Sequence, residues 1–171
     1  MLDNLLSIMT LASHLCLAAF LSYLLVRKYF KIGIAEGFVG FVKRRAILIS
    51  LVMTSVALLG SLYFSEIQGF EPCHLCWWQR IFIYPQVALF VVAIIKRKKD
   101  VFIYTLPLTV MGLLTSVYHN SLLLSQATGA CSATGSDCLT QFFVSFGYIN
   151  IPVMALTTFI VLLVVGMLAN K

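Results

Sequence analysis

Long apolar runs separated by short polar stretches dominate the pattern of this chain. Each run is close to the ~20 residues that an α-helix needs to cross ~30 Å of hydrocarbon. A bilayer offers no water to satisfy backbone polar groups, so a spanning run of this length is expected to be helical. The predicted spans are residues 5–26, 46–64, 77–95, 101–124 and 151–168.

The composition agrees with this pattern. Of the 171 residues, 61% are hydrophobic and 11% are charged, which excludes a soluble globular domain. Nearly the whole length lies in the predicted spans, so function must reside in the helix bundle and its loops. We therefore predict an all-α integral membrane protein. A four-helix transmembrane bundle, residues 46–171, is preceded by one extra N-terminal transmembrane helix and a basic loop, residues 1–45.

The net charge of +6 reflects membrane topology rather than nucleic-acid binding. If every run spans, all Lys and Arg residues except Arg80 fall on one side of the membrane. By the positive-inside rule that side is cytoplasmic. The loops 65–72 and 125–150 contain no Lys or Arg and are expected to face outward, with Trp77 and Trp78 at the outer interface.

The first apolar run has the position of a cleaved signal peptide. Its positive charges follow the run instead of preceding it, and no small-residue cleavage site stands in the usual place. We therefore expect a retained span with its N-terminus outside. His14 and Cys16 lie within this run, and helix packing inside the bundle is the expected role of both.

Cysteines carry the candidate chemistry. Four of the five lie in the outward loops, as Cys73 with Cys76 and Cys131 with Cys138, in a compartment where disulfides persist. One interpretation is two structural disulfides, and a bridge between Cys131 and Cys138 would stabilise the fold by ~2 to 3 kcal/mol. Another is a zinc site of four thiolates, which the oxidising side of the membrane disfavours.

The motif Cys73-x-x-Cys76 is difficult to explain as a structural crosslink, because it closes almost no chain. Pro72 precedes it at the expected start of the third span, where a helix tolerates proline. Unpaired N–H groups and the positive end of the dipole at a helix N-terminus favour thiolate, the form that attacks disulfides. This placement predicts a redox-active pair.

Three polar residues near this pair are candidate ligands of an electron acceptor. Arg80 lies four residues after Cys76, on the same helix face and ~6 Å deeper, where an arginine is costly. Its guanidinium could bind a carbonyl oxygen and stabilise negative charge on reduction, or it could extend to the outer surface. Gln79 could donate a hydrogen bond or only pack. His119, at a comparable depth, could bond the acceptor, shuttle protons or only bond a neighbouring helix.

These residues resemble the DsbB/BdbC family of disulfide bond formation proteins, the quinone reductases that reoxidise thioredoxin-fold disulfide donors. The similarity covers roughly residues 46–168, in the order span, Cys-x-x-Cys, two spans, cysteine loop, span. Its motifs are CHLCWWQR from Cys73 to Arg80, Tyr84-Pro85, and Tyr118-His119 before the second pair. Two features depart from the family: the first span is extra, and only six residues separate Cys131 from Cys138.

The resemblance implies an enzyme, a quinone-dependent protein-disulfide oxidoreductase. It would be a multi-pass protein of the bacterial cytoplasmic membrane, with its cysteine loops on the periplasmic or extracellular side. Its cofactor would be ubiquinone or menaquinone, and its partner a DsbA/BdbD-like donor protein of thioredoxin fold. The residues that bind the quinone would be Cys76, Gln79, Arg80 and His119.

The resemblance also implies a relay among the cysteines. A reduced donor would attack the Cys131–Cys138 disulfide, with Cys131 forming the mixed disulfide and Cys138 linking to Cys73. Electrons would then pass to the Cys73–Cys76 pair, and Cys76 as thiolate would contact the quinone.

Two alternatives differ in their predictions. A vitamin K epoxide reductase-like protein also joins a four-helix bundle, two cysteine pairs and a quinone, but its Cys-x-x-Cys comes late in the chain. A non-enzymatic membrane scaffold with two structural disulfides predicts that Cys76→Ser and Arg80→Ala leave donor oxidation unchanged.

Overall fold

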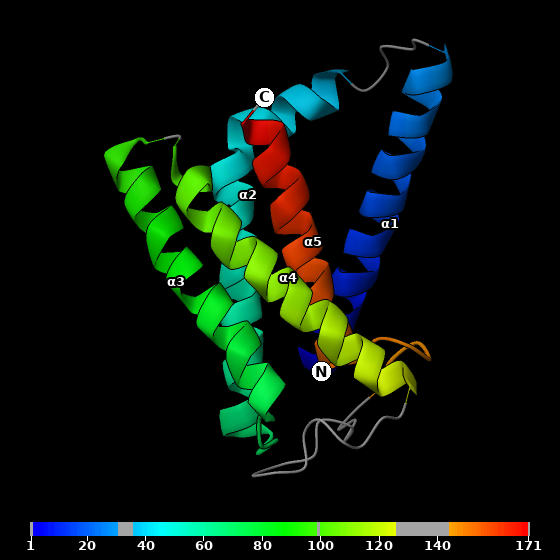
Figure 1. Ribbon diagram of the computed structural model, residues 1–171, viewed down its shortest axis with the longest axis vertical. Coiled ribbons are helices and arrows are strands. Elements are labelled where there is room, and N and C mark those ends of the chain that lie inside the picture. The colour runs from blue at the N-terminus through cyan, green and yellow to red at the C-terminus, as the bar shows by residue number, and fades with distance from the viewer. Residues whose placement is uncertain (1, 31–35, 99, 126–143, 171) are drawn as a thin grey trace.

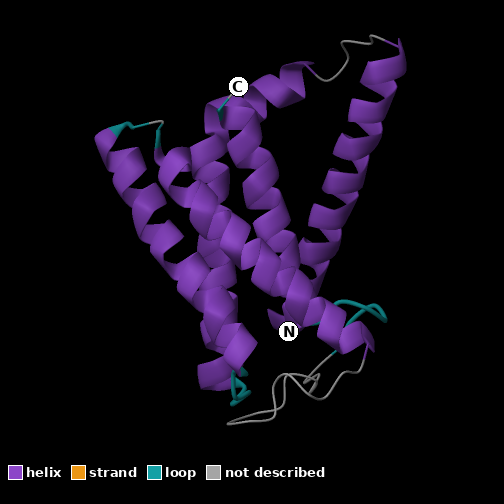
Figure 2. Ribbon diagram, viewed as in Figure 1, coloured by secondary structure: helices purple, strands orange, loops and turns teal. Residues whose placement is uncertain are grey.

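The computed structural model describes residues 2–30, 36–98, 100–125 and 144–170. All regular secondary structure in these ranges is helical (Figures 1 and 2), which confirms the predicted all-α fold. The helices are α1 (Leu2–Phe30), α2 (Glu36–Leu62) followed by the π-helical turn η1 (Tyr63–Ile67), α3 (His74–Lys96), α4 (Val101–Ser125) and α5 (Ile151–Ala169).

Four helices of the described chain are long and apolar enough to cross a membrane, and they coincide with the four predicted spans of the bundle. Their bounds are Val39–Ile67, His74–Lys96, Val101–Ser125 and Ile151–Ala169. The apolar helix at the N-terminus, Asn4–Phe20 in its described part, is shorter. That α1 crosses the membrane therefore stays a prediction.

Helix α2 begins well before the apolar run that predicted it, at Glu36 instead of residue 46. Hydropathy marks only the part of a helix that lies in hydrocarbon, and the basic residues Lys43, Arg44 and Arg45 interrupt that signal. These three side chains are exposed on α2. Their long stems can follow the helix surface while their charges remain in the polar interface, so the helix continues through them.

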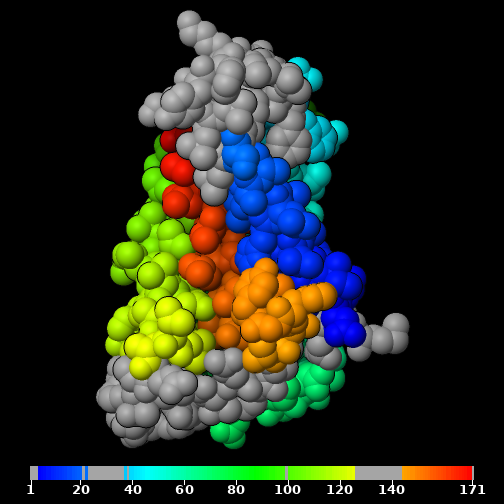
Figure 3. Space-filling model, turned by 90° about the vertical axis from the view of Figure 1, so that its right-hand side faces the viewer, coloured from blue at the N-terminus to red at the C-terminus, as the bar shows by residue number. Residues whose placement is uncertain are grey.

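Helices α2 to α5 form one bundle, in which α3 packs between α2 and α4, and α5 also packs against α2 and α4. The start of α3 lies at the same end as the end of α4 and the start of α5 (Figure 1). We call this the cysteine end, after Cys73 and Cys76. The opposite end carries the exposed basic residues of α2 and α3, and we call it the basic end. Helix α1 packs against α5 at the cysteine end (Figure 3) and diverges from it toward the basic end (Figure 1).

An apolar core fills the basic end of the bundle. Phe90 is only 1% exposed, and its ring lies 5.8 Å from that of Phe102 between centroids. All four bundle helices contribute to the core, whose buried members are Val42, Ala46, Phe90, Ala93, Val101, Phe102, Leu162 and Val165.

The middle of the bundle relies on close approach and on polar contacts between helices. A Cβ atom at Gly112 of α4 would overlap the ring of Phe159 on α5, so only glycine permits this approach. Between α3 and α4, the Thr109 hydroxyl lies 3.2 Å from Oε1 of the fully buried Gln86. Small residues and interhelical hydrogen bonds are the expected means of association where lipid removes the hydrophobic driving force.

Candidate active site

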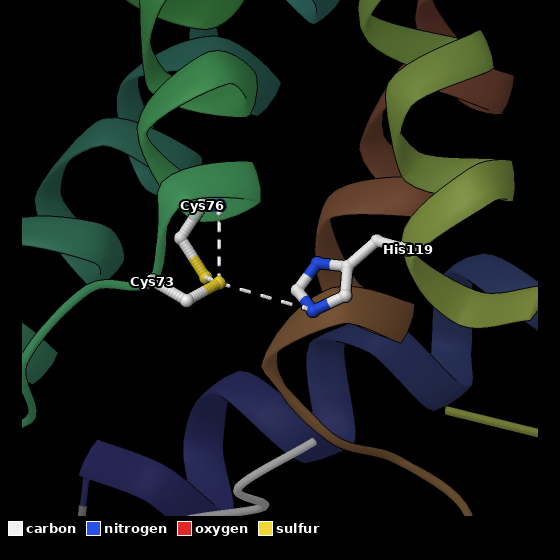
Figure 4. Close-up of side chains that lie close together, drawn as sticks. All are labelled: Cys73, Cys76 and His119. Atoms are coloured by element: carbon white, nitrogen blue, oxygen red, sulfur yellow. Dashed lines mark hydrogen bonds between the residues drawn. The ribbon is translucent and has the colours of Figure 1, made fainter. Parts of the chain in front are cut away.

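The Cys-x-x-Cys motif forms the first turn of α3, as predicted. Cys73 is the N-cap residue, with extended backbone (φ −65°, ψ 166°), and Pro72 lies just outside the helix. The backbone N–H of Cys76 donates to Cys73 Sγ at 3.3 Å, which satisfies one of the amide groups left unpaired at a helix start. The two sulfur atoms lie 2.8 Å apart (Figure 4). The local fold therefore brings both thiols together at the cysteine end.

His119 of α4 completes a buried group with these sulfurs. Its side chain is 1% exposed, and its Nε2 lies 3.9 Å from Cys73 Sγ (Figure 4). Its other ring nitrogen, Nδ1, lies 3.4 Å from Nε2 of the buried Gln79. An amide that donates to Nδ1 leaves the proton of a neutral imidazole on Nε2, facing Cys73. Gln79 thus orients His119, a role that the sequence did not indicate.

The surroundings of Cys73 favour its thiolate. Cys73 lies just outside the span His74–Lys96. The hydrogen bond from the Cys76 side chain lowers the pKa of the Cys73 thiol most, and the hydrogen bond and charge of His119 lower it further. Burial acts in the opposite direction, and the net pKa lies well below the ordinary thiol value. The reduced pair therefore presents a nucleophile at neutral pH.

Arg80 is held inside the protein and does not extend to the outer surface. It is 9% exposed. Its Nε donates to Ser61 Oγ at 2.7 Å and its Nη2 to the Ser61 carbonyl oxygen at 2.9 Å, both on α2. Its guanidinium carbon lies 5.4 Å from the centroid of the Trp77 ring, a cation–π contact. No hydrogen bond of Nη1 occurs within the described chain, so donors remain for a ligand.

A cavity of about 150 Å³ lies beside these groups, with a wall that is mostly apolar. Helix α3 contributes Cys73, Cys76, Gln79, Arg80, Ile83 and Tyr84, and α4 contributes His119. The predicted candidates on α3 and α4 thus share one cavity. The Tyr84 hydroxyl is buried and has no hydrogen-bond partner among the described residues.

Sequence reasoning did not assign roles to Ser61 and Tyr84. Ser61 could not be identified, because its contact with Arg80 depends on how α2 and α3 are rotated about their axes. Tyr84 did leave a signal, since Cys76, Arg80 and Tyr84 recur every four residues and share one helix face.

Several other predicted residues lie elsewhere. Cys131 and Cys138 fall outside the described residues, and so does their proposed disulfide. On α1, His14 packs against α5 through Thr157, as expected. The expectation that Cys16 packs inside the bundle is wrong, because its side chain is exposed. It follows His14 by two residues and so points to nearly the opposite side of the helix.

The same group offers possible metal ligands. Within the described chain, ligand atoms of Cys73, Cys76 and His119 all lie within 4.8 Å of one another. This set differs from the four-thiolate zinc site considered from the sequence, since a histidine replaces the second cysteine pair. Sulfur and imidazole ligands suit zinc, but the same two sulfurs are close enough for thiol–disulfide chemistry.

A family profile described as "Disulfide bond formation protein DsbB" matches residues 43–169. This range covers most of the chain and includes α3, α4, α5 and the site described above. The chain belongs to the DsbB family. The match begins after α1, which is therefore an addition to the part shared with the family.

Relatives of this DsbB-family protein are named for disulfide formation. The "Probable disulfide formation protein C" of Halalkalibacterium halodurans is 40% identical over 116 residues, which cover 66% of this chain and 83% of that protein. The "Disulfide bond formation protein C" of Bacillus subtilis is 39% identical over 120 residues, 67% of this chain and 85% of that protein. No solved structure matches this DsbB-family chain.

Family membership supports membrane thiol–disulfide oxidation by redox-active cysteines, with a thiol–disulfide partner. It confirms the predicted resemblance to the DsbB/BdbC family. The candidate site of this DsbB-family chain comprises a cysteine pair at a helix N-terminus, a buried histidine, a fixed arginine and a mostly apolar cavity.

Proposed function

We propose that this protein reoxidises a thioredoxin-fold, DsbA/BdbD-like donor protein and passes the electrons to a membrane quinone, ubiquinone or menaquinone. One observation carries the proposal: the sulfurs of Cys73 and Cys76 border the same mostly apolar cavity as the buried guanidinium of Arg80. A disulfide needs no such cavity to oxidise a soluble protein, whereas an apolar electron acceptor from the membrane needs one in which to bind.

The residues present fit a quinone. Its ring and tail are apolar and suit the mostly apolar wall, and its carbonyl oxygens accept hydrogen bonds. Arg80 retains N–H donors beyond those given to Ser61, and the buried Tyr84 hydroxyl lacks a partner within the described residues. Arg80 and Tyr84 lie ~6 Å and ~12 Å deeper along α3 than Cys76. Donors at two depths match a ligand with oxygens on opposite sides of its ring.

The chain's own residues divide the chemistry. Cys73 is the thiolate stabilised by the helix start and by His119, and we assign it the exchange with the second cysteine pair. Cys76 lies one turn into the helix, nearer to Arg80, and we assign it the contact with the acceptor. Arg80, fixed by Ser61, stabilises negative charge at a carbonyl oxygen without having to reorient. His119, oriented by Gln79, directs its Nε2–H toward Cys73 and stabilises the thiolate through that hydrogen bond.

The overall reaction balances. Oxidation of the donor's two thiols reduces one disulfide of this chain, through the Cys131–Cys138 pair in our proposal. Thiol–disulfide exchange then re-forms the Cys131–Cys138 disulfide and reduces the Cys73–Cys76 disulfide to two thiols. A quinone held in the cavity supplies the acceptor, since re-forming the Cys73–Cys76 disulfide releases two electrons and two protons that convert quinone to hydroquinone.

The test is quinone absorbance in purified protein after a reduced thioredoxin-fold donor is added. The wild type and the Cys16→Ser control are expected to consume quinone at a catalytic rate, because Cys16 is exposed on α1. Cys76→Ser is expected to consume none. Equal rates in wild type and Cys76→Ser, or no consumption by folded, oxidised wild type, would contradict the proposal. The second of these results would favour the scaffold with structural disulfides.

A further inference from the structure

Helix α1 lies outside the range that matches the family, yet it contributes to the cavity. Its lining residues are Leu6, Met9, Thr10 and Ser13, which recur at helical spacing and form one face of α1. Residues on another face, such as Leu15 at 65% exposure, point away from the bundle. A helix that only filled space against α5 would not need to border this cavity.

Leu6 and His14 hold α1 across the junction of α2 and α5. A Cβ atom at Gly60 of α2 would lie 3.4 Å from a Leu6 methyl group, so α1 comes within contact distance of α2 at this position. On the other side, His14 Nε2 lies 2.7 Å from the Thr157 hydroxyl of α5. His14 Nδ1 also lies 3.1 Å from the Tyr148 hydroxyl, and the two rings stack with centroids 5.8 Å apart. Figure 3 shows α1 lying against α5 and the segment that precedes it.

The face that α1 turns to the cavity is suited to an apolar ligand. The Thr10 hydroxyl donates to the Leu6 carbonyl oxygen at 2.8 Å, and the Ser13 hydroxyl donates to that of Met9 at 2.9 Å. Because α1's own backbone accepts these hydrogen bonds, neither hydroxyl group needs an acceptor inside the cavity. The surface left for a ligand is made of methyl, methylene and thioether groups.

We propose that α1 is a specificity-determining wall of the acceptor site, in which Met9 and Ser13 contact the quinone and His14 holds the helix in place. This inference rests on the function proposed above. It predicts that the affinity and choice of quinone depend on a helix that the family match does not include.

The decisive comparison is Ser13→Phe against Leu15→Phe. Both add a ring to α1, but only the first adds it on the face toward the cavity. Quenching of the chain's two tryptophans, Trp77 and Trp78, by decylubiquinone and by menaquinone-1 gives a Kd without turnover. We expect Ser13→Phe to raise the Kd at least tenfold and Leu15→Phe to leave it within twofold.

The possible outcomes separate the two proposals. If the wild type binds either quinone and Ser13→Phe binds it equally well, the proposed role of α1 in the acceptor site is refuted while the proposed function stands. If the wild type binds neither quinone, both are refuted.

A second measurement does not depend on adding bulk to the cavity. Ser13→Cys and Leu15→Cys are each made together with Cys16→Ser, and the native pairs are kept oxidised so that one thiol reacts with a membrane-permeant maleimide. Bound decylubiquinone or menaquinone-1 is expected to slow labelling of the Ser13→Cys protein at least fivefold. It is expected to leave the Leu15→Cys protein unchanged. Equal rates with and without quinone at both positions would overturn the proposal.

Discussion

The two ends of the bundle are built differently. At the basic end, Phe90 and Phe102 belong to a cluster of closely packed apolar side chains from four helices. At the cysteine end, the buried cluster contains Cys73, Leu75 and Leu122, and a cavity lies beside it. Packed cores maximise contact and resist deformation, whereas a cavity forgoes those contacts. The difference indicates that the basic end holds the helices in place and the cysteine end is kept open for chemistry.

Three of the buried polar side chains belong to the site at the cysteine end. His119, Gln79 and Arg80 are all buried at the cysteine end, where a membrane protein has few ways to satisfy polar groups. Each contacts another member of the site or a neighbouring helix. Such contacts reduce the cost of burial and also fix the direction in which each group points. The polar groups therefore combine a structural and a chemical role.

Truncation in the packed end gives the largest expected effect on stability. Phe90→Ala should lower the free energy of unfolding by ~3 to 5 kcal/mol, because a buried ring is replaced by a void. It should leave the reactivity of the cysteine pair in folded protein unchanged. Thermal unfolding in detergent and alkylation rates of the reduced pair check both parts. A loss of thiol reactivity without a loss of stability would contradict the claim that the basic end stabilises the bundle and the cysteine end carries the chemistry.

Arg80→Lys tests the fixed charge at the cysteine end. Lysine keeps the charge but cannot reproduce the paired hydrogen bonds from Nε and Nη2 to Ser61. We expect quinone affinity to fall ~10- to 100-fold, since a hydrogen bond to a charged group contributes ~1.5 to 3 kcal/mol. Arg97→Lys, at the end of α3 on the basic side, is the matched control. Equal quinone affinity in both variants would mean that a positive charge at position 80 is enough for quinone binding, without the hydrogen bonds to Ser61.

Gly112→Ala tests the close approach of α4 and α5. The added methyl group meets the ring of Phe159, and overpacking of this kind costs ~1 to 3 kcal/mol. Gly40→Ala is the control, because nothing lies within 4 Å of a Cβ there and alanine favours helix. Melting temperatures should fall for the first variant and stay equal or rise for the second. The opposite order would show that α4 and α5 can separate freely.

The titration of Cys73 tests the hydrogen bonds that surround the cysteine pair. In reduced protein, alkylation of Cys73 should persist below the ordinary thiol range, because Cys76 and His119 lower its pKa. Removing either partner raises that pKa, so Cys76→Ala and His119→Ala should move the alkylation midpoint to higher pH. The first should move it further, because its hydrogen bond contributes most. Mass spectrometry of the Cys73 peptide measures the rate, and unchanged midpoints would remove His119 from the site.

The sequence predicted what depends on distance along one helix. The spans followed from hydropathy, and the pairing of Cys73 with Cys76 followed from their positions in the first turn of α3. Their spacing to Arg80 put all three on neighbouring faces, and the structure places them around one cavity.

Contacts between helices could not be predicted in this way. Such contacts depend on how each helix is rotated about its axis. They include the hydrogen bonds from Arg80 to Ser61 and from Gln79 to His119, and also the face of α1 that borders the cavity. In a helix that is apolar on nearly every side, hydropathy carries little information on that rotation. The roles of Cys131 and Cys138, which lie outside the described residues, stay predictions.

The most direct test of the central claim is a single turnover without donor. Fully reduced protein is mixed with one equivalent of quinone, and the cysteines are then alkylated and mapped by mass spectrometry. The proposed mechanism predicts one hydroquinone formed for each Cys73–Cys76 disulfide that appears, and none in Cys76→Ser. Quinone reduction that leaves both thiols of the pair intact, or a reduced pair that never reduces quinone, would contradict it.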